Sequence, residues 1–270
     1  MQESSSHIPK ILITGGTSGL GYELVKLFLK KGYHVVTTGR RDLSLPESGS
    51  RLSLYKVDFS DLKTTADVFR QIAETNQFDL VINNAGILSP PRLILTNNGL
   101  EYTLQVNFLS HLLANEIILR RRENNRPLRI ASITSPVYRI ARIENGNRKR
   151  YRALRAYSDS KLYLALMSGY LSELHRDSNI ICFSFNPGTF GSGIYRMQSR
   201  VFSILYWIAA PFMRSPSKVA EALGKILTAK DISGNVIYNL NNRVRQIPVT
   251  EKGITETFWK ECYEKIRPFL

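Results

Sequence analysis

Short runs of apolar and β-branched residues alternate with longer segments of helical period along this chain of 270 residues. Such an alternation is typical of parallel strands that are joined by crossover helices. It predicts an α/β fold with one doubly wound parallel sheet of about seven strands and helices on both faces. The expected strands span residues 11–14, 34–38, 53–57, 80–83, 129–134, 180–185 and 236–239, and the expected helices span residues 20–31, 61–74, 100–122, 157–175 and 217–228.

The composition is that of a globular protein, with 43% hydrophobic and 22% charged residues. One α/β domain of this length can bury a large core. We therefore expect a flexible polar lead over residues 1–9 and a single domain over residues 10–270. The weakly patterned stretch 191–216 follows the sixth expected strand, where we expect a substrate lid or pocket segment.

The sequence also points away from membrane spans and secretion. No run reaches the roughly 18 apolar residues of a transmembrane helix, and the longest candidate, residues 201–213, falls short. The first residues, MQESSSHIPK, lack the basic start and apolar core of a secretory signal. Cys182 and Cys262 form neither a metal spacing nor a disulfide framework. We expect a reducing, cytoplasmic setting.

A glycine-rich turn, TGGTSGLG at residues 14–21, follows the first expected strand and precedes a helix. Glycines allow the backbone to approach a pyrophosphate closely, and the phosphate then lies against the N–H groups and positive dipole end of the helix. The context favours dinucleotide binding over a plain tight turn. The residues predicted to hold the cofactor here are Gly15, Thr17, Ser18, Gly19, Leu20 and Gly21.

Ligands of open α/β sheets bind beyond the carboxyl ends of the strands, so the residues that follow each strand are informative. The third expected strand leads into Asp58 and Phe59, and the fourth into NNAG at residues 83–86. Alone, Asp58 would be a helix cap and NNAG a turn. Together with the spacing TGxxxGxG, however, these segments resemble the short-chain dehydrogenase/reductase family, which has a Rossmann-type fold. The resemblance implies that Asp58 contacts adenine and that Phe59, Asn84, Ala85 and Gly86 line the cofactor site.

The end of the second expected strand indicates which cofactor is bound. An NAD enzyme usually carries an acid there, which accepts hydrogen bonds from the ribose 2′-hydroxyl. Here Gly39 stands at that position, followed by Arg40 and Arg41, whose guanidinium groups suit a 2′-phosphate. We therefore favour NADP(H) over NAD(H), against the alternative that both arginines only face solvent. Thr17 weakens this preference slightly, because some NADP-binding relatives carry a second basic residue within the glycine turn.

Tyr157 and Lys161 form a YxxxK element near the start of a long expected helix. Residues four apart share a helix face, and a nearby cation lowers the pKa of a phenol. Tyr157 could then act as an acid or base at cellular pH. By itself, a surface tyrosine beside an exposed lysine would be the commoner explanation. The position after the fifth expected strand instead resembles the catalytic pair of the family.

Further residues match the family in order along the chain. Ser135 ends the segment SITS and resembles the serine that holds the substrate oxygen, and Asn107 resembles the asparagine that steadies a water linking the lysine to solvent. Pro187 and Gly188 resemble the turn that closes over the nicotinamide, and Thr189 and Ser192 offer hydroxyl groups to its carboxamide. The implied reaction is hydride transfer between the nicotinamide and a carbonyl carbon, coupled to proton transfer by Tyr157.

Within the family, residues 210–216 (APFMRSP) and 234–238 (GNVIY) are similar to those of the retinol dehydrogenase and WW-domain oxidoreductase group. The spacing between Ser135 and Tyr157 also suits that group. The resemblance implies a lipophilic aldehyde, ketone or alcohol as substrate. A non-catalytic NADP(H) sensor or scaffold of the same fold remains the alternative, although all four catalytic positions are filled. Relatives are frequently dimers or tetramers, so we expect a homodimer or homotetramer.

The net charge of +15 attracts anions in general. Much of the surplus lies in residues 139–155, between the catalytic serine and tyrosine. The basic residues there are Arg139, Arg142, Arg148, Lys149, Arg150, Arg152 and Arg155, against one acid, Glu144. Three interpretations stay open: a solvated loop, a contact for an acidic carrier or a membrane surface, and a nucleic-acid patch. The last is disfavoured, because Tyr138 and Tyr151 do not form a stacking pattern.

Overall fold

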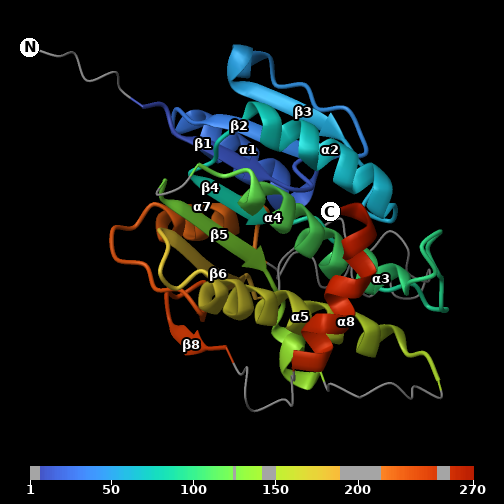
Figure 1. Ribbon diagram of the computed structural model, residues 1–270. Coiled ribbons are helices and arrows are strands. Elements are labelled where there is room, and N and C mark those ends of the chain that lie inside the picture. The colour runs from blue at the N-terminus through green and yellow to red at the C-terminus, as the bar shows by residue number, and fades with distance from the viewer. Residues whose placement is uncertain (1–6, 124–125, 142–149, 189–213, 248–255) are drawn as a thin grey trace, which may run out of the picture.

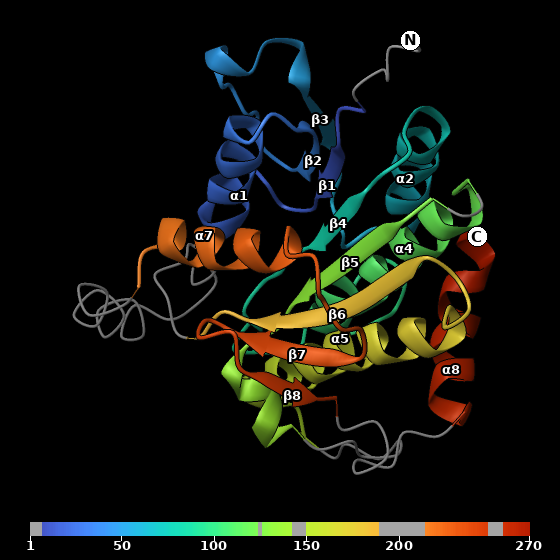
Figure 2. The ribbon, with the colours of Figure 1, turned by 90° about the vertical axis from the view of Figure 1, so that its left-hand side faces the viewer.

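An eight-stranded sheet between two layers of helices forms the protein, in a computed structural model that describes residues 7–123, 126–141, 150–188, 214–247 and 256–270 (Figures 1 and 2). The strand order is β3-β2-β1-β4-β5-β6-β7-β8, and all neighbours are parallel except β7 and β8. The predicted doubly wound fold is thus confirmed. The strands are β1 Lys10–Ile13, β2 His34–Gly39, β3 Leu52–Lys56, β4 Leu80–Asn83, β5 Leu128–Ile133, β6 Ile180–Asn186, β7 Val236–Asn239 and β8 Val244–Gln246.

Helices cover both faces of this sheet. On one face α1 packs against α7, and on the other lie α2, α4 and α5, as Figure 2 shows. The α-helices are α1 Gly19–Lys30, α2 Leu62–Thr75, α3 Tyr102–Leu104, α4 Ser110–Arg120, α5 Ala153–Leu174, α7 Pro216–Leu227 and α8 Glu256–Ile266, and the 3₁₀ helices are Pro46–Arg51, Pro136–Ile140 and Arg267–Phe269. None of the described helices is long and apolar enough to cross a membrane.

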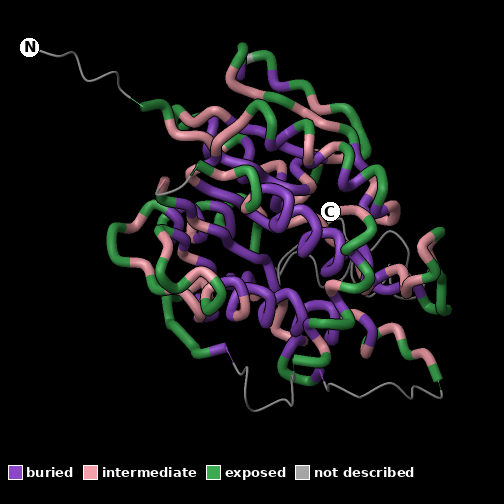
Figure 3. Tube along the Cα trace, viewed as in Figure 1, coloured by how far each residue is buried: buried purple, intermediate pink, exposed green. Residues whose placement is uncertain are grey.

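The central strands are mostly apolar because both of their faces are covered. In β1, Leu12 packs into the core under α2, α4 and α5, whereas its neighbours Ile11 and Ile13 pack under α1 and α7. This alternation follows from the two-residue period of a strand. The buried segments of Figure 3 therefore run through the middle of the molecule as two cores, one on each face of the sheet.

Two expected helices differ from the structure in ways that concern the site. The helix expected over 100–122 consists of α3, a π-helical turn at Gln105–Leu109 and α4. The helix expected to begin at residue 157 begins at Ala153, four residues earlier, so that Tyr157 lies within its second turn. A π turn inside a helix changes the direction of its side chains, and such turns are frequent at functional sites.

The strand β8 and the helix α8 were not among the expected elements. The three residues of β8 are all exposed and show no apolar alternation, so the sequence carries no strand signal there. By contrast, α8 has buried residues at Trp259, Cys262 and Ile266, a spacing that indicates an amphipathic helix. Trp259 stacks on Tyr170 of α5, with ring centroids 4.2 Å apart. The C-terminal helix thereby covers the outer side of the helix that carries Tyr157 and Lys161.

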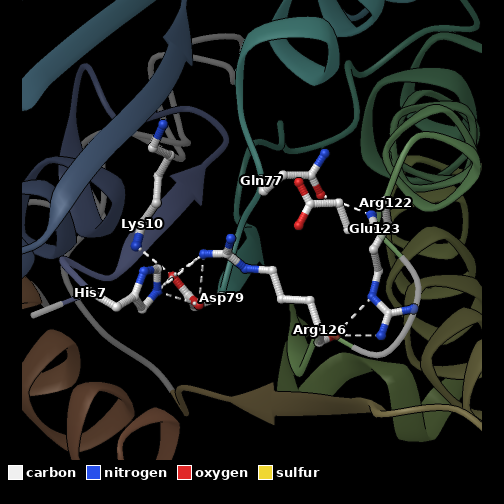
Figure 4. Close-up of polar contacts among 7 residues, drawn as sticks. All are labelled: His7, Lys10, Gln77, Asp79, Arg122, Glu123 and Arg126. Atoms are coloured by element: carbon white, nitrogen blue, oxygen red, sulfur yellow. Dashed lines mark hydrogen bonds and ion pairs between the residues drawn. The ribbon is translucent and has the colours of Figure 1, made fainter. Parts of the chain in front are cut away.

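A cluster of polar side chains lies at the amino ends of β1, β4 and β5 (Figure 4). The carboxylate of Asp79 accepts a hydrogen bond from the backbone N–H of Lys10 at 2.7 Å, and it contacts Nε2 of His7 at 3.0 Å and Nη2 of Arg126 at 3.2 Å. These contacts join the residues just before three strands. The edge opposite to the expected ligand site is therefore held together by charged groups.

Candidate active site

A cleft of about 840 Å³ opens at the carboxyl ends of the strands. It runs without interruption from the glycine-rich turn after β1 to the segments after β5 and β6. The predicted site residues that line it are Gly15, Thr17, Ser18, Gly19, Leu20, Gly21, Arg40, Arg41, Asp58, Phe59, Asn84, Ala85, Gly86, Ser135, Tyr157, Lys161, Pro187 and Gly188. The fold thus brings residues from six separate loops into one cavity.

The glycine turn and the NNAG loop are packed directly against each other. Gly15 has φ +71°, and a Cβ atom there would lie 2.9 Å from the Cα atom of Ala85. The hydroxyl of Thr14 accepts hydrogen bonds from the backbone N–H groups of Asn84 and Ala85, each at 2.9 Å, and the Asn84 amide donates to the Thr14 carbonyl at 2.8 Å. Thr14 was not among the predicted site residues, yet it joins the two loops that are expected to hold the cofactor.

The end of β2 has no room for a side chain at residue 39. A Cβ atom on Gly39 would lie 2.4 Å from Cγ2 and 2.7 Å from Oγ1 of Thr17. Nη2 of Arg41 donates to the Thr17 carbonyl at 3.2 Å, while Nη1 of Arg40 lies 3.8 Å from a carboxylate oxygen of Asp58. The guanidinium of Arg40 is exposed and lines the cleft. A side chain at position 39 would thus require Thr17 to move, and the chain instead has glycine there, followed by two arginines at the cleft.

At the other end of the cleft, Ser135 follows β5, and Tyr157 and Lys161 extend from the first turns of α5. The ammonium of Lys161 donates to the Ile133 carbonyl at 3.0 Å and lies 5.9 Å from the centroid of the Tyr157 ring. Lys161 is only 3% exposed, and this burial lowers its pKa to about 8. The i, i+4 spacing therefore does place the phenol and the ammonium on the same side of the helix.

Asn107 lies behind the cleft wall and is fully buried. Its amide nitrogen donates to the Ile87 carbonyl and to Oγ of Ser160, each at 3.0 Å, and its amide oxygen accepts from the Ile87 N–H at 2.8 Å. Because Asn107 lies in the π turn, its side chain can join the loop after β4 to the helix of Tyr157. A Cβ atom on Gly86 would lie 3.2 Å from its amide oxygen and 3.4 Å from the Lys161 ammonium. The structure thus brings Asn107 and Lys161 to the same glycine.

His111 is a further residue that was not predicted. It lies one helical turn after Asn107 and is fully buried, with its ring edge-to-face on Phe59. Its Nε2 atom lies 2.9 Å from the Ala85 carbonyl, and burial lowers its pKa to about 4. The imidazole is therefore neutral at cellular pH, and Nε2 must carry the proton because a carbonyl only accepts. A polar residue on an apolar helix, four residues after Asn107, is the signal that could have identified it.

Replacing His111 by Leu should weaken cofactor binding about fivefold, the worth of one hydrogen bond. The leucine cannot donate to the Ala85 carbonyl, so the NNAG loop loses one of the contacts that fix it. The dissociation constant of the reduced nicotinamide cofactor can be measured from its fluorescence. Asn115→Leu is the matched control, because Asn115 is also a buried polar residue of α4 but contacts Met167. Equal dissociation constants for the His111 variant and the unaltered protein would contradict this role.

Some predicted residues lie outside the described part of the chain. They include Thr189 and Ser192 of the expected nicotinamide loop, nearly all of the expected lid at 191–216, and Arg142, Arg148 and Lys149 of the basic run. Gly188, which precedes this gap, has φ +68°, and its N–H donates to the Asn186 side chain at 3.0 Å. Of the basic run, Arg139, Arg150 and Arg152 are described and exposed, and Arg155 is partly buried.

Comparison with known proteins bears on the whole chain. A family model described as short chain dehydrogenase matches residues 9–200. Retinol dehydrogenase 12 of Mus musculus is 27% identical over 235 residues, which are 82% of this chain and 74% of that protein. Two solved structures share the fold: ElxO with NADP bound (TM-score 0.64, 19% identity, 87% of this chain and 97% of that one) and 4-hydroxyisoleucine dehydrogenase complexed with NADH and succinate (TM-score 0.66, 20% identity, 85% and 96%).

Proposed function

Because this chain belongs to the short-chain dehydrogenase family, we propose that it is an NADP(H)-dependent oxidoreductase that interconverts a carbonyl and an alcohol on a lipophilic small molecule. The observation that carries the proposal is the continuity of the cleft. A nicotinamide cofactor that begins at the glycine turn would end beside Ser135, Tyr157 and Lys161, which line the same cavity. The chain belongs to a family of oxidoreductases, and we propose its cofactor form, its substrate class and the roles of its residues.

The proposed mechanism assigns one task to each residue at the reacting end. The nicotinamide, when bound, supplies or accepts the hydride. Tyr157 donates a proton to the substrate oxygen or removes one, and Ser135 positions that oxygen by a hydrogen bond. The ammonium of Lys161 lowers the pKa of the Tyr157 phenol and holds the nicotinamide ribose. Asn107, buried next to Gly86, steadies the path by which the proton reaches solvent.

The proposed preference for NADP(H) is supported by the end of β2. Solved relatives of this fold bind NADP or NADH, so the fold does not decide the cofactor. Position 39, where an acid would bind a ribose diol, holds glycine, and a longer side chain there would require Thr17 to move. Arg40 lines the cleft at the same place and offers a planar set of donors to a 2′-phosphate.

Arg40→Ser should raise the KM for NADPH by about ten- to hundredfold, the range expected for a lost hydrogen bond between charged groups. The KM for NADH should change little, since NADH has no 2′-phosphate. Steady-state kinetics with both cofactors measure the difference. Lys56→Ser is the matched control, because Lys56 is an exposed cation on β3 that pairs with Asp42 outside the cleft. An equal rise of the KM for NADPH and for NADH would show that Arg40 does not bind the 2′-phosphate.

The proposed lipophilic substrate is supported by the wall of the cleft near Tyr157. Its side chains are mostly apolar, and among the described residues of this end Lys161 is the only charged one. The apolar lining residues are Ile87, Leu88, Val106, Ile133, Val137, Ala153 and Leu154. The name of the mouse relative, retinol dehydrogenase, points to the same class of substrate.

The decisive experiment is oxidation of NADPH by the purified protein with a panel of carbonyl compounds. The panel should contain retinal, long-chain aliphatic aldehydes, steroid ketones, quinones and carrier-bound ketoacyl groups. We expect turnover with lipophilic aldehydes or ketones, and faster turnover than with small hydrophilic aldehydes. If no compound of the panel is reduced, and none is formed by oxidation of the corresponding alcohol, the protein is instead an NADP(H) sensor or scaffold.

Assembly, domain organisation and location also remain proposals. We propose one domain over residues 10–270, a homodimer or homotetramer, and a cytoplasmic protein that can associate with a membrane surface. Light scattering coupled to size-exclusion chromatography gives the oligomeric state directly. A monomer at micromolar concentration would overturn the proposed assembly without affecting the cofactor site.

A further inference from the structure

Exposed apolar side chains are concentrated in two segments that also contribute lining residues to the cleft. Eight large apolar residues of the described chain are strongly exposed, and five belong to the segments 88–101 and 136–155, which follow β4 and β5. These five are Leu93, Ile94, Leu95, Ile140 and Leu154. Leu154 is 60% exposed and also lines the cleft, so the apolar wall of the cleft continues onto the outer surface. We call the described residues of the two segments the mouth surface.

The two segments are held together as one surface. The hydroxyl of Tyr151 donates to the Pro90 carbonyl at 2.9 Å, and both segments contribute lining residues to the cleft. Within the first segment, a bridge between Leu95 and Glu101 and a hydrogen bond from the Tyr102 N–H to the Ile94 carbonyl at 3.0 Å fix the loop. In Figure 1 this loop and the start of α5 lie on the same side of the molecule, and the loop is largely exposed in Figure 3. Its apolar side chains are therefore displayed by an ordered backbone.

The charge of the mouth surface is positive. Arg92, Arg139, Arg150 and Arg152 are all exposed. Glu101 is the one acid among the described residues of the two segments. It is partly buried, and its carboxylate accepts hydrogen bonds from the N–H groups of Thr103 and Leu104 at 3.0 and 2.7 Å. The exposed charges that the described residues of the mouth surface display beside the aliphatic side chains are thus those of arginines.

We propose that the mouth surface binds an anionic lipid bilayer and places the opening of the cleft against the lipid. Aliphatic side chains enter the boundary between headgroups and acyl chains, while arginines contact the anionic headgroups, so the two kinds of residue act together. The aliphatic residues come from two segments that both contribute to the cleft lining, which suits a flat partner larger than the cleft itself. The proposal rests on the proposed function in one respect: a lipophilic substrate would be dissolved in the bilayer that the surface contacts.

The test is sedimentation of the NADPH-loaded full chain with vesicles. We expect it to pellet with phosphatidylcholine vesicles that contain phosphatidylserine, and far less with phosphatidylcholine alone. Arg92→Gln/Arg152→Gln should weaken binding about 25-fold, at about fivefold for each arginine. Leu93→Gln/Leu95→Gln should weaken it at least tenfold, because two aliphatic side chains no longer enter the lipid.

Matched controls lie at the opposite edge of the sheet. Lys30→Gln/Lys31→Gln removes the same net charge from the end of α1, and Leu174→Gln alters an equally exposed leucine at the end of α5. Both controls should bind vesicles like the unaltered protein. An equal loss in the control with two lysine substitutions would show that net charge alone acts, and would overturn the mouth surface as the docking site. No pelleting at all, or capture by an immobilised acidic carrier protein in its place, would overturn the bilayer as the partner.

Failure of this proposal can be distinguished from failure of the proposed function. Vesicle binding is measured without turnover, and NADPH oxidation is measured with a carbonyl compound in free solution. Turnover without vesicle binding rejects only the proposed docking surface. Vesicle binding without turnover on any substrate rejects only the proposed enzymatic activity. If both hold, acidic vesicles should accelerate reduction of a vesicle-dissolved aldehyde, and Leu93→Gln/Leu95→Gln should lose this acceleration but keep its rate on a hydrophilic aldehyde.

Discussion

Tyr157→Phe is expected to lower kcat by about 10²- to 10⁴-fold, the usual contribution of a positioned acid or base. Phenylalanine keeps the ring on the first turns of α5 but removes the hydroxyl that we propose exchanges a proton with the substrate oxygen. The affinity for NADPH should stay nearly unchanged, because the glycine turn, the NNAG loop and Arg40 are untouched. Single-turnover kinetics with the best substrate of the panel, together with cofactor fluorescence, separate the two quantities.

Tyr170→Phe is the control for this experiment, since Tyr170 lies on the same helix but stacks on Trp259 away from the cleft. Its turnover should stay close to that of the unaltered protein. Undiminished turnover of Tyr157→Phe would exclude the tyrosine as the proton donor. Tyr157→Phe also distinguishes an enzyme from a sensor or scaffold. Partner binding by a sensor does not depend on proton transfer, so it should be unaffected in this variant.

Lys161→Met should abolish most of the turnover and at the same time stabilise the cofactor-free protein at neutral pH. The ammonium of Lys161 is buried, and its pKa is lowered from 10.5 to about 8. This difference corresponds to about 3 kcal/mol of unfavourable free energy in the folded state while the lysine is charged. Methionine removes that charge at similar volume but leaves the Ile133 carbonyl unpaired. A net gain of about 2 kcal/mol in the free energy of unfolding is therefore expected.

The gain should depend on pH in a defined direction. At and below about pH 8 the lysine is charged in both states, so the burial penalty is fully present. Between about pH 8 and 10.5 the unfolded chain binds the proton and the folded chain does not, so the stability of the unaltered protein rises with pH. Urea unfolding of both proteins at several pH values measures the difference. A stability difference that does not shrink above pH 8 would contradict a buried, charged Lys161.

Much of the candidate site could be located because its residues follow strands that are visible in the sequence. The ends of β1, β4 and β5 are marked by apolar runs, and parallel strands end at the same edge of a sheet. The glycine turn, NNAG and Ser135 were therefore expected to meet before any distance was known. The YxxxK spacing placed Tyr157 and Lys161 on one helix face, although α5 begins four residues earlier than expected.

Other parts of the site depend on contacts between residues that are far apart in the chain. The hydroxyl of Thr14 accepts a hydrogen bond from the backbone N–H of Asn84, which lies 70 residues later in the chain. The ring of His111 contacts the carbonyl of Ala85, the next residue along the chain. Thr14 has no local pattern that distinguishes it from an ordinary buried polar residue, and the spacing of four residues after Asn107 marks His111 without showing what it contacts. The π turn that directs Asn107 toward Ile87 and Ser160 also depends on packing, since the helical period of 100–122 is uninterrupted in the sequence.

The sequence by itself therefore determined the order of the elements, the doubly wound sheet and the set of residues at its carboxyl edge, because periodicity and loop motifs are local properties of the chain. Only the tertiary structure decided that a side chain at position 39 would collide with Thr17, that Lys161 is buried enough to lower its pKa, and that two segments with exposed aliphatic residues and arginines line the same cleft. Each of these depends on which distant atoms occupy the surrounding space. Burial and steric exclusion are properties of the packed chain, and no local pattern encodes them.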